Sequence, residues 1–400
     1  MRVLLISDTE AKGGAAIAAS RMACALAGQG HEIGMVVNDP QDGPPVGPWR
    51  RFVVGGGEAI PWDRVPDALL EAEAVDGLKR VLDDFSPDAV SVHNIHGGAK
   101  VGWSVDMVRV CADRVPTVWT LHDTWSFTGR CAYLNGCPFF PDRCGRDCPS
   151  SGEYPFLNPD RVPGEFARKR DVLTRAGRLA AAAPSGWMAD LAGRSAWAGR
   201  EIRRIPNCLD AEVFFPGDQA EARRALGLDV EGRVVLLCAA DCSDPRKGVG
   251  LAVEALGRMD RPPTLLVMGR PTDFSGAEDM RVIRLDFVAD DADKRQAYSA
   301  ADIMVHPALQ DNLPNTVLES LACGTPVAGF DIGGMSDLVL DGQTGRLADT
   351  VSPQGLVSAV EDCLARSAVL GAAGRTHVLE RYAEAETAAC WTALIESMKE

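Results

Sequence analysis

The sequence predicts an α/β protein built from two doubly wound parallel sheets, each in a domain of its own. Short apolar runs of strand length alternate with helix-length segments along the chain, as expected of β-α-β units. This alternation starts twice, at residues 2–7 and again at residues 233–241. The length of 400 residues and the hydrophobic content of 46% are sufficient for two domains with separate cores.

The overall charge argues against some classes of partner. The formal net charge is −15 at pH 7, whereas a nucleic-acid-binding protein needs basic surfaces. The first ten residues hold too short an apolar run for a signal peptide, and no apolar run is long enough for a membrane span. We therefore expect a cytoplasmic protein without nucleic-acid partners, whose 12 cysteines are mostly reduced.

Basic residues are nevertheless concentrated in residues 161–204, which contain nine arginines and one lysine. Such a run usually belongs to solvated helix faces, which is the interpretation we favour. The alternative is a patch that meets a lipid-linked pyrophosphate acceptor, with at most peripheral contact between the protein and the inner face of a membrane.

The first domain is expected to open with a β-α-β unit. It comprises a strand at residues 2–7, a helix at 15–29 and a strand at 31–37. The loop between the first strand and the helix lacks the G-x-G-x-x-G pattern, which removes the main support for a nicotinamide-dependent dehydrogenase. Gly13 and Gly14 in this loop still allow a ligand to approach the backbone closely, although a tight turn without a ligand is the alternative. Residues 38–66 are rich in glycine and proline and predict an irregular, exposed excursion.

Histidines follow two of the later strands of this domain. The further elements are a helix at 67–85, strands within 87–98, 116–129 and 178–185, and a helix at 186–193. Ligands of open α/β sheets gather outside the carboxyl ends of the strands. We therefore expect His122, which precedes Asp123, to be an acceptor-side or catalytic group, although it could simply orient its loop. His93 and His96 are weaker candidates of the same kind.

A cysteine-rich loop at residues 129–150 follows these histidines. Its four cysteines, Cys131, Cys137, Cys144 and Cys148, have the spacing C-x5-C-x6-C-x3-C. Four thiolates could bind a structural zinc ion, but the paired C-x-x-C spacing of common zinc sites is missing. Two disulfides, which a reducing compartment disfavours, and four free thiols are the alternatives.

The second domain repeats the alternation of strands and helices. We expect a helix at 221–228, strands at 233–241 and 264–269, a further segment at 281–288 and a strand within 298–308. The stretch 310–334 then starts with Asp311 in a polar loop, continues as a helix from Pro314 to about Gly324 and ends in a Gly333-Gly334 turn. A helix N-terminus beside glycine turns favours an anion, while Asp311 and Glu319 suit the hydroxyl groups of a polyol.

The stretch 310–334 resembles the donor-site signature of family-4 retaining glycosyltransferases, in which E-x7-E precedes a helix ending in A-x-G-x-P-V. The matching residues are Glu319, Ala322, Gly324, Pro326 and Val327. Asp311 stands where the first glutamate usually is. The resemblance covers nearly the whole chain, including T-L-H-D at His122, an R-K-G at 246–248 and a P-N-C-L-D link with Cys208 in place of glycine. Similar cysteine-bearing insertions occur in members of the colanic-acid type.

The resemblance implies the GT-B arrangement, in which two doubly wound domains face each other across a cleft. Residues 1–207 would form the acceptor-side domain and residues 208–382 the nucleotide-sugar donor domain. A C-terminal helix within residues 383–400 would cross back to the first domain.

The resemblance also implies roles for individual residues. Arg246 and Lys247 would neutralise the leaving diphosphate, Glu319 would bind the ribose hydroxyls, and Asp311 would contact the donor sugar. With His122, these four residues form the catalytic set. The residues implied to bind the donor are Gly13, Gly14, Arg246, Lys247, Gly269, Phe287, Val288, Asp311, Asn312, Leu313, Pro314, Asn315 and Glu319.

The function implied is transfer of a hexose-type sugar, with retention, from a UDP- or GDP-linked donor to a glycan or lipid-linked acceptor in polysaccharide biosynthesis. No cofactor is required for this chemistry, and zinc would be structural only. Two alternatives stay open. A GT-B nucleotide-sugar epimerase would turn over the donor without an acceptor, and a non-catalytic nucleotide-sugar-binding protein would bind the donor and turn nothing over.

Overall fold

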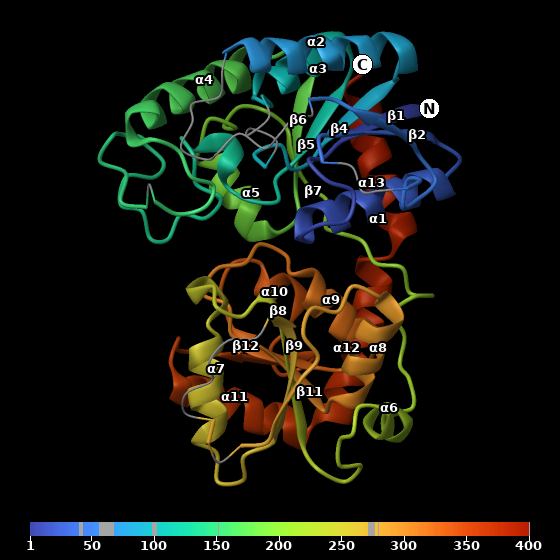
Figure 1. Ribbon diagram of the computed structural model, residues 1–400, viewed down its shortest axis with the longest axis vertical. Helices are drawn as coiled ribbons and strands as arrows, with labels where there is room; N and C mark the ends of the chain where they lie inside the picture. The colour runs from blue at the N-terminus through green and yellow to red at the C-terminus, as the bar shows by residue number, and fades with distance from the viewer. Residues whose placement is uncertain are drawn as a thin grey trace. The chain divides into compact units, whose positions relative to one another are not determined.

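The computed structural model describes residues 1–39, 43–55, 68–97, 102–150, 152–270, 277–278 and 280–399 of the chain (Figure 1). The chain divides into two compact units. The first comprises Met1–Cys208 together with Glu384–Glu400, and the second comprises Leu209–Ala383. Each unit has helices packed on both faces of a parallel sheet, which confirms the doubly wound α/β class expected from the sequence.

The first unit is built on a sheet whose seven described strands lie in the order β3-β2-β1-β4-β5-β6-β7, with all neighbours parallel. The strands are β1 (Arg2–Ile6), β2 (Glu32–Val37), β3 (Arg50–Val53), β4 (Ala89–Val92), β5 (Thr117–Thr120), β6 (Leu179–Ala183) and β7 (Ile202–Arg204). The helices are α1 (Gly14–Gly28), α2 (Ala68–Phe85), α3 (Asp106–Arg114), α4 (Val162–Arg175), α5 (Gly186–Gly193) and α13 (Glu384–Ser397).

Strand β1 shows how this sheet is buried on both faces. Leu4 and Ile6 belong to the core cluster on one face, while Val3 and Leu5 belong to the cluster on the other. The division follows because successive side chains of a strand point to opposite faces. Helices α2, α3, α4 and α5 contribute to the first cluster, and α1 and α13 contribute to the second.

Strand β3 corrects one sequence-based expectation. The irregular excursion predicted for residues 38–66 is wrong for Arg50–Val53, which pairs in parallel with β2 at the edge of the sheet. The strand was hard to recognise because it is short, begins with two arginines and has no fully buried residue. Residues 40–42 and 56–66 lie outside the described part of the chain.

The last helix returns to the first unit. Helix α13 packs beside α1, although the whole second unit separates the two helices in sequence (Figure 1). The side-chain amide of Gln29 donates a hydrogen bond to the Ala385 carbonyl at 3.1 Å. Trp391, Leu394 and Ile395 are buried in the core cluster of that face. All eight tryptophans of the sequence are numbered within the first unit.

The second unit has a sheet whose six described strands lie in the order β10-β9-β8-β11-β12-β13, again all parallel. The strands are β8 (Val234–Asp241), β9 (Thr264–Arg270), β10 (Val282–Arg284), β11 (Ile303–His306), β12 (Val327–Phe330) and β13 (Gly345–Ala348). The helices are α6 (Gln219–Ala225), α7 (Val249–Gly257), α8 (Asp291–Ala300), α9 (Asn315–Ala322), α10 (Met335–Leu338), α11 (Pro353–Ala365) and α12 (Ser367–Arg381).

Helix α9 follows its sequence signals closely. Pro314 is its N-cap, and the helix ends at Ala322. Gly324 has a φ of 76°, the left-handed conformation in which glycine commonly terminates a helix. Buried Val317, Leu318 and Leu321 anchor the helix in the core.

In each sheet the strand order reverses once, and the loops that follow the two strands at the reversal lie side by side, at a position where ligands commonly bind. The order reverses between β1 and β4 in the first unit and between β8 and β11 in the second. At such a reversal the following connections leave to opposite faces, which opens a crevice beyond the carboxyl ends of the strands. Among the described helices, none is both long and apolar enough to cross a bilayer.

Candidate functional site

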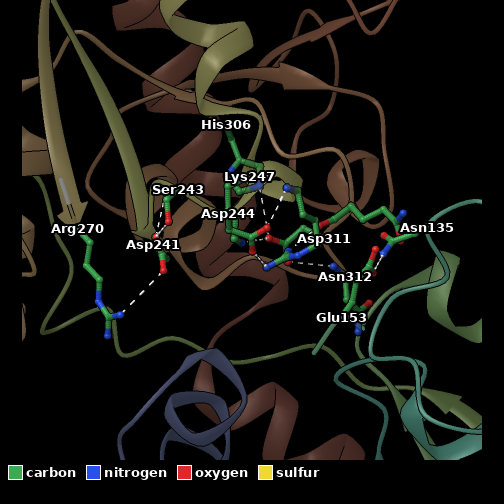
Figure 2. A network of polar contacts seen from close by, with 12 residues as sticks. Asn135, Glu153, Asp241, Ser243, Asp244, Lys247, Arg270, His306, Asp311 and Asn312 are labelled. Carbon is green, nitrogen blue, oxygen red and sulfur yellow. Dashed lines mark hydrogen bonds and ion pairs between the residues drawn. The ribbon is translucent and has the colours of Figure 1, made fainter. Parts of the chain in front are cut away.

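The candidate site of the second unit lies at the reversal between β8 and β11. The loop after β8 carries Arg246 and Lys247, and the loop after β11 carries Asp311. These residues are 64 positions apart in sequence, yet the Lys247 ammonium lies 2.7 Å from an Asp311 carboxylate oxygen (Figure 2). The fold therefore brings the two predicted halves of the site together within one unit.

Asp244 holds the basic loop in its conformation. Its carboxylate accepts a bond from the Arg246 backbone N–H and another from the Arg246 guanidinium, both at 2.9 Å. The same guanidinium donates to the Gln310 carbonyl at 2.9 Å, which ties this loop to the loop after β11. Sequence reasoning missed Asp244, although an aspartate followed by proline and a short turn is a common capping arrangement.

Gly248 is required by the geometry behind the two cations. It has a φ of 64° and is the N-cap of α7. A Cβ at this position would stand 2.0 Å from the Pro307 carbonyl oxygen, because the loop after β11 passes directly behind it. The R-K-G sequence therefore combines two cations with the one residue that fits the turn.

Asp311 is ionised because of its cationic neighbours. Burial is the largest single influence and would raise the pKa of its carboxyl group, but Lys247, His306 and Arg246 together outweigh burial and hold the pKa below its ordinary value. His306 lies 3.7 Å from the same carboxylate, and burial lowers the pKa of this histidine to about 4. The imidazole is therefore neutral near pH 7, and among the described residues its Nε2 has no hydrogen-bond partner. Figure 2 shows His306, Lys247 and Asp311 facing one another.

The loop before α9 is shaped for close backbone approach. The Asn312 backbone N–H donates to the Asp311 carboxylate at 3.0 Å, and the Gly334 N–H donates to the Asp311 carbonyl at 3.3 Å. Gly333 has a φ of 64°, and a Cβ there would stand 1.8 Å from that carbonyl oxygen. The N-terminus of α9 and the glycine turn thus meet at Asp311.

Glu319 is placed deeper than its predicted role suggests. It is buried, and its carboxylate accepts a 2.8 Å hydrogen bond from the hydroxyl of Tyr298 on α8. The buried tyrosine stays protonated because burial, reinforced by Glu319, raises its pKa well above the ordinary value. Sequence reasoning did not identify Tyr298, which shows no periodic or motif signal apart from its helix.

The other predicted donor residues have varied environments. Leu313 is buried in the core, Asn312 is also buried, and Pro314 and Asn315 begin α9. Gly269 ends the apolar part of β9, where a Cβ would stand 1.8 Å from the Ala239 carbonyl oxygen. The other members are a largely exposed Phe287, a Val288 packed on the core, and Gly13 and Gly14, which begin α1 in the first unit.

A second polar group lies at the reversal between β1 and β4 in the first unit. The Asp8 carboxylate, after β1, accepts a 3.0 Å bond from the Asn94 side chain, after β4. Burial raises the pKa of Asp8 to about 6, although the neighbouring His96 opposes the rise. A pocket at this edge is lined by residues 93–96 and by residues 119–123, Trp125 and Ser126.

The three predicted histidines, His93, His96 and His122, all lie in this region. His93 and His122 share a hydrogen bond of 2.9 Å between ring nitrogens, and the other nitrogen of His93 lies 3.1 Å from the Ser91 hydroxyl. Burial lowers the pKa of His122 to about 4 and holds the pKa of His93 well below its ordinary value, so the His93 and His122 rings are neutral near pH 7. His96 instead pairs with Asp123 at 2.8 Å. Sequence reasoning missed the partner of its other nitrogen, the hydroxyl of Tyr154 at 3.0 Å.

The cysteine-rich loop gathers its thiols without forming a metal site. Cys131 and Cys148 both contact the Ser150 hydroxyl, at 3.7 and 3.9 Å, and Cys144 accepts a bond from the Gly129 N–H. All four cysteines are free thiols. Among the described residues, no three histidine, cysteine, aspartate or glutamate side chains are grouped so that they could hold a metal ion. The arrangement therefore does not fit a zinc ion as it stands.

The basic run of residues 161–204 is less exposed than expected. Arg168 pairs with Glu71 at 2.8 Å and with Asp106 at 2.6 Å. Lys169 is buried and donates to backbone carbonyl groups, among them those of Trp125 and Thr128. Solvated helix faces are thus the wrong description for these two cations, whose role is to hold neighbouring segments together.

Comparison with known proteins shows related sequences over most of the chain. The profile described as "Glycosyltransferase Family 4" matches residues 12–213, and the profile described as "Glycosyl transferases group 1" matches residues 233–366. A D-inositol 3-phosphate glycosyltransferase of Acidothermus cellulolyticus is 29% identical over 78% of this chain and 67% of its own length. A colanic acid biosynthesis glycosyl transferase, WcaC of Escherichia coli K12, is 29% identical over 53% of this chain and 51% of its own length.

Solved structures resemble the whole chain. The sucrose-phosphate synthase of Thermosynechococcus elongatus superposes with a TM-score of 0.71 at 21% identity, covering 100% of this chain and 97% of its own. Anabaena Alr3699/HepE, in complex with UDP and glucose, superposes with a TM-score of 0.70 at 17% identity, covering 99% and 100%. At this level of identity these likenesses show the fold, which is the GT-B fold.

Proposed function

Because the chain belongs to glycosyltransferase family 4, we propose that it transfers a hexose-type sugar, with retention of configuration, from a nucleoside-diphosphate sugar to a hydroxyl group of an acceptor. The acceptor is a glycan or a lipid-linked glycan in polysaccharide biosynthesis, as the WcaC relative suggests. The observation that carries the proposal is the meeting of Lys247 and Asp311 at 2.7 Å beside the N-terminus of α9.

The second unit supplies the donor side of this reaction. Arg246 and Lys247 bind the diphosphate and stabilise the negative charge that grows on it as the glycosidic bond breaks. The backbone N–H groups at the N-terminus of α9 add further stabilisation of the same charge. Asp311 accepts hydrogen bonds from the donor sugar, and Glu319 with Tyr298 forms the polar floor beneath the ribose.

The chemistry needs no cofactor. The acceptor hydroxyl attacks the anomeric carbon from the side on which the diphosphate leaves, and a phosphate oxygen takes its proton. The task of the protein is then to position the two substrates and to stabilise charge. A uridine nucleotide is the first candidate, because the HepE structures contain UDP and UDP-glucose.

Calorimetric binding of UDP and of GDP to the wild type and to the double variant Arg246→Ala/Lys247→Ala tests the donor site. We expect one nucleotide to bind the wild type and the double variant to lose at least about tenfold in affinity, since a charge-assisted hydrogen bond contributes roughly 1.5–3 kcal/mol. Arg258→Ala is the matched control, because it removes an exposed cation at the other end of α7. No binding of either nucleotide, or equal binding by the double variant, would contradict the proposal.

Turnover distinguishes the transferase from its competitors. With the nucleotide identified, the corresponding sugar donor is incubated with and without an acceptor panel. A transferase produces a new glycoside whose anomeric configuration, read by NMR, matches that of the donor. An altered sugar formed without acceptor would favour an epimerase, and donor binding without any product would favour a non-catalytic protein.

A further inference from the structure

An aromatic side chain stands at the edge of the first sheet with its ring open to solvent. Tyr154 is 63% exposed, whereas its hydroxyl end is enclosed and bonded to the Nδ1 of His96 at 3.0 Å. The Tyr154 and His96 rings form a T-shaped pair, with centroids 5.4 Å apart. The face of the phenol ring is thus available to a ligand while its tip is fixed.

The fixed tip belongs to a continuous polar chain. The His96 Nε2 donates to the Asp123 carboxylate, whose other oxygen accepts a 2.9 Å bond from the Trp125 backbone N–H. Burial raises the pKa of the Tyr154 phenol, and the Asp8 and Asp123 carboxylates raise it further. The phenol is therefore a neutral donor to His96, which leaves it unsuited to be a nucleophile or a base near pH 7.

The backbone of the segment that carries Tyr154 is hydrogen-bonded to one buried arginine. We refer to residues 152–156 as the strap. The Arg130 guanidinium, which is 2% exposed, donates to the Pro155 carbonyl at 2.8 Å and also to the Ser150 and Glu153 carbonyls. Because these bonds fix the strap backbone, the Tyr154 ring does not have to be ordered when a ligand binds.

Hydrogen-bonding groups for hydroxyls lie beside the ring. The Asn94 side chain donates a 3.0 Å hydrogen bond to Asp8. Both residues influence the pKa of the Tyr154 phenol, which the Asp8 carboxylate raises and a hydrogen bond with Asn94 lowers. The backbone there is closely packed, since a Cβ on Gly97 would stand 2.0 Å from an Asp8 carboxylate oxygen. Carboxylate and amide groups next to an exposed aromatic face are the groups that recognise the hydroxyls and the apolar face of a sugar ring.

The charges at this edge disfavour a phosphate. The phenol hydroxyl is bonded to His96, the carboxylates that act on it are those of Asp8 and Asp123, and Glu153 lies on the strap itself. The cations Arg130 and Lys169 donate to backbone carbonyl groups from buried positions. An anionic ligand at the phenol would therefore meet two carboxylates while these two cations are already engaged.

From this geometry we infer that the Tyr154 ring, with Asp8 and Asn94, forms a subsite for an uncharged sugar residue of the acceptor. The sugar ring stacks on the exposed phenol face, and its hydroxyls bond to the Asp8 carboxylate and the Asn94 side chain. The inference rests on the proposed function and deepens it, because it assigns the chemical class of the acceptor that the first unit binds.

Ligand-observed NMR titrations on the full chain test this subsite. The probes are the methyl α-glycosides of glucose, galactose, mannose and N-acetylglucosamine, with glucose 6-phosphate as the charged counterpart of the first. We expect at least one methyl glycoside to bind the wild type saturably and Tyr154→Ala to weaken it at least tenfold. Tyr154→Phe keeps the ring and loses only the bond to His96, so its affinity should fall by less.

Two controls separate the subsite from a general loss of structure. Phe139→Ala removes an aromatic ring of the neighbouring loop that is covered by Arg143, and it should leave glycoside binding unchanged. UDP and GDP affinities, measured on the same variants, report on the second unit and should also be unchanged. If the wild type binds neither UDP nor GDP, that result would count against the proposed function instead.

Three outcomes would overturn the inference. These are equal glycoside binding by wild type and Tyr154→Ala, tighter binding of glucose 6-phosphate than of methyl α-glucoside, and absence of saturable binding of all four glycosides. Each result is independent of nucleotide binding, so the acceptor class can fail while the transferase assignment stands.

Discussion

Asp8 is an unusual carboxyl group because its burial opposes ionisation. The pKa of Asp8 is raised from 3.8 to about 6 by burial, while His96 and the Thr9 N–H only partly counter this effect. A carboxyl group whose pKa is higher in the folded state favours folding when it is protonated. Its contribution is therefore present below the unfolded pKa of 3.8 and is lost as the pH rises through about 6.

We predict that Asp8→Asn removes this pH dependence. A pKa rise from 3.8 to about 6 corresponds to roughly 3 kcal/mol of unfolding free energy in total, of which the wild type loses roughly 2 kcal/mol between pH 4 and pH 7. The variant should thus gain stability relative to the wild type across this interval. Urea unfolding followed by tryptophan fluorescence at the two pH values measures the difference, and a constant difference between variant and wild type would contradict the prediction.

Sequence patterns identified residues at the site better than they identified their partners. Arg246, Lys247 and Asp311 could be named because they stand in a compact motif or at fixed spacing from one. Tyr298 and Tyr154 could not be named, because each acquires its contact only when distant segments fold together. Asp244 was missed although its contact with Arg246 is local. The Tyr154 bond to His96 spans 58 residues of sequence, and no local spacing signals it.

At the scale of elements, the turn into α7 places both cations of the donor site. We predict that Gly248→Ala destabilises the second unit by more than about 2 kcal/mol, because its φ of 64° strains any other residue and its Cβ would collide with the Pro307 carbonyl. Nucleotide affinity should fall in parallel, since Arg246 and Lys247 directly precede this glycine.

Gly250, two residues along, is the matched control for this change. It is exposed, lies within α7, and an added Cβ there would meet nothing within 4 Å. Gly250→Ala should therefore stabilise the protein by roughly 0.5–1 kcal/mol through reduced backbone entropy of the unfolded chain. Urea unfolding followed by circular dichroism measures the free energy of unfolding of both variants. Similar values for Gly248→Ala and Gly250→Ala would show that the turn does not need glycine.

The cysteine-rich loop is the element whose function depends most on a direct test. The four thiols share one loop, and burial raises the pKa of Cys131 to about 11, which a bound Zn²⁺ would oppose by stabilising the thiolate. Because the loop side chains are not grouped to hold a metal ion, we predict less than about half an equivalent of zinc per chain in protein purified without chelator, with four titratable loop thiols. About one zinc per chain, lost in Cys131→Ser and retained in Cys390→Ser, which alters an exposed cysteine of α13, would contradict the prediction.

Elements were predictable from sequence to different degrees for physical reasons. Central strands such as β1 and β8 are buried on both faces, so their apolar runs stand out. The edge strand β3 has no such run. The strap has no periodic pattern, and its backbone is held by hydrogen bonds from Arg130, which is distant in sequence.

At the scale of the molecule, the return of α13 to the first unit links the two ends of the chain. Trp391 is fully buried in a cluster that includes Val3, Leu5 and Met22. We predict that Trp391→Ala destabilises the first unit by roughly 3–5 kcal/mol, the usual range for deleting a large buried aromatic side chain. Hydrogen exchange should show faster opening of β1 and α1, with β8 and β11 unchanged.

Tryptophan fluorescence provides an independent reading of the same variant. All eight tryptophans are numbered within the first unit, so the fluorescence transition reports on that unit alone. It should move to lower urea in Trp391→Ala, while UDP or GDP binding to the second unit persists. Equal loss of protection in both units would show that they unfold as one cooperative body.

The overall architecture was accessible from sequence because it depends on repeated β-α alternation and on a link motif near Cys208. The order of strands within each sheet was not accessible in this way, since it depends on which apolar faces pack together and no single segment records it.

The placement of α13 also has a consequence for the folding of the protein during its synthesis on the ribosome. A ribosome that has completed residue 208 has synthesised every described strand of the first unit but none of the helix that covers Val3 and Leu5. The intervening residues 209–383 take on the order of 9–35 s to synthesise at about 5–20 residues per second. During this interval the nascent first unit carries an uncovered apolar face, while the second unit can already complete its own core. A nascent chain that stops short of Trp391 would therefore be a client for chaperones, because residues 384–400 are needed to cover this face.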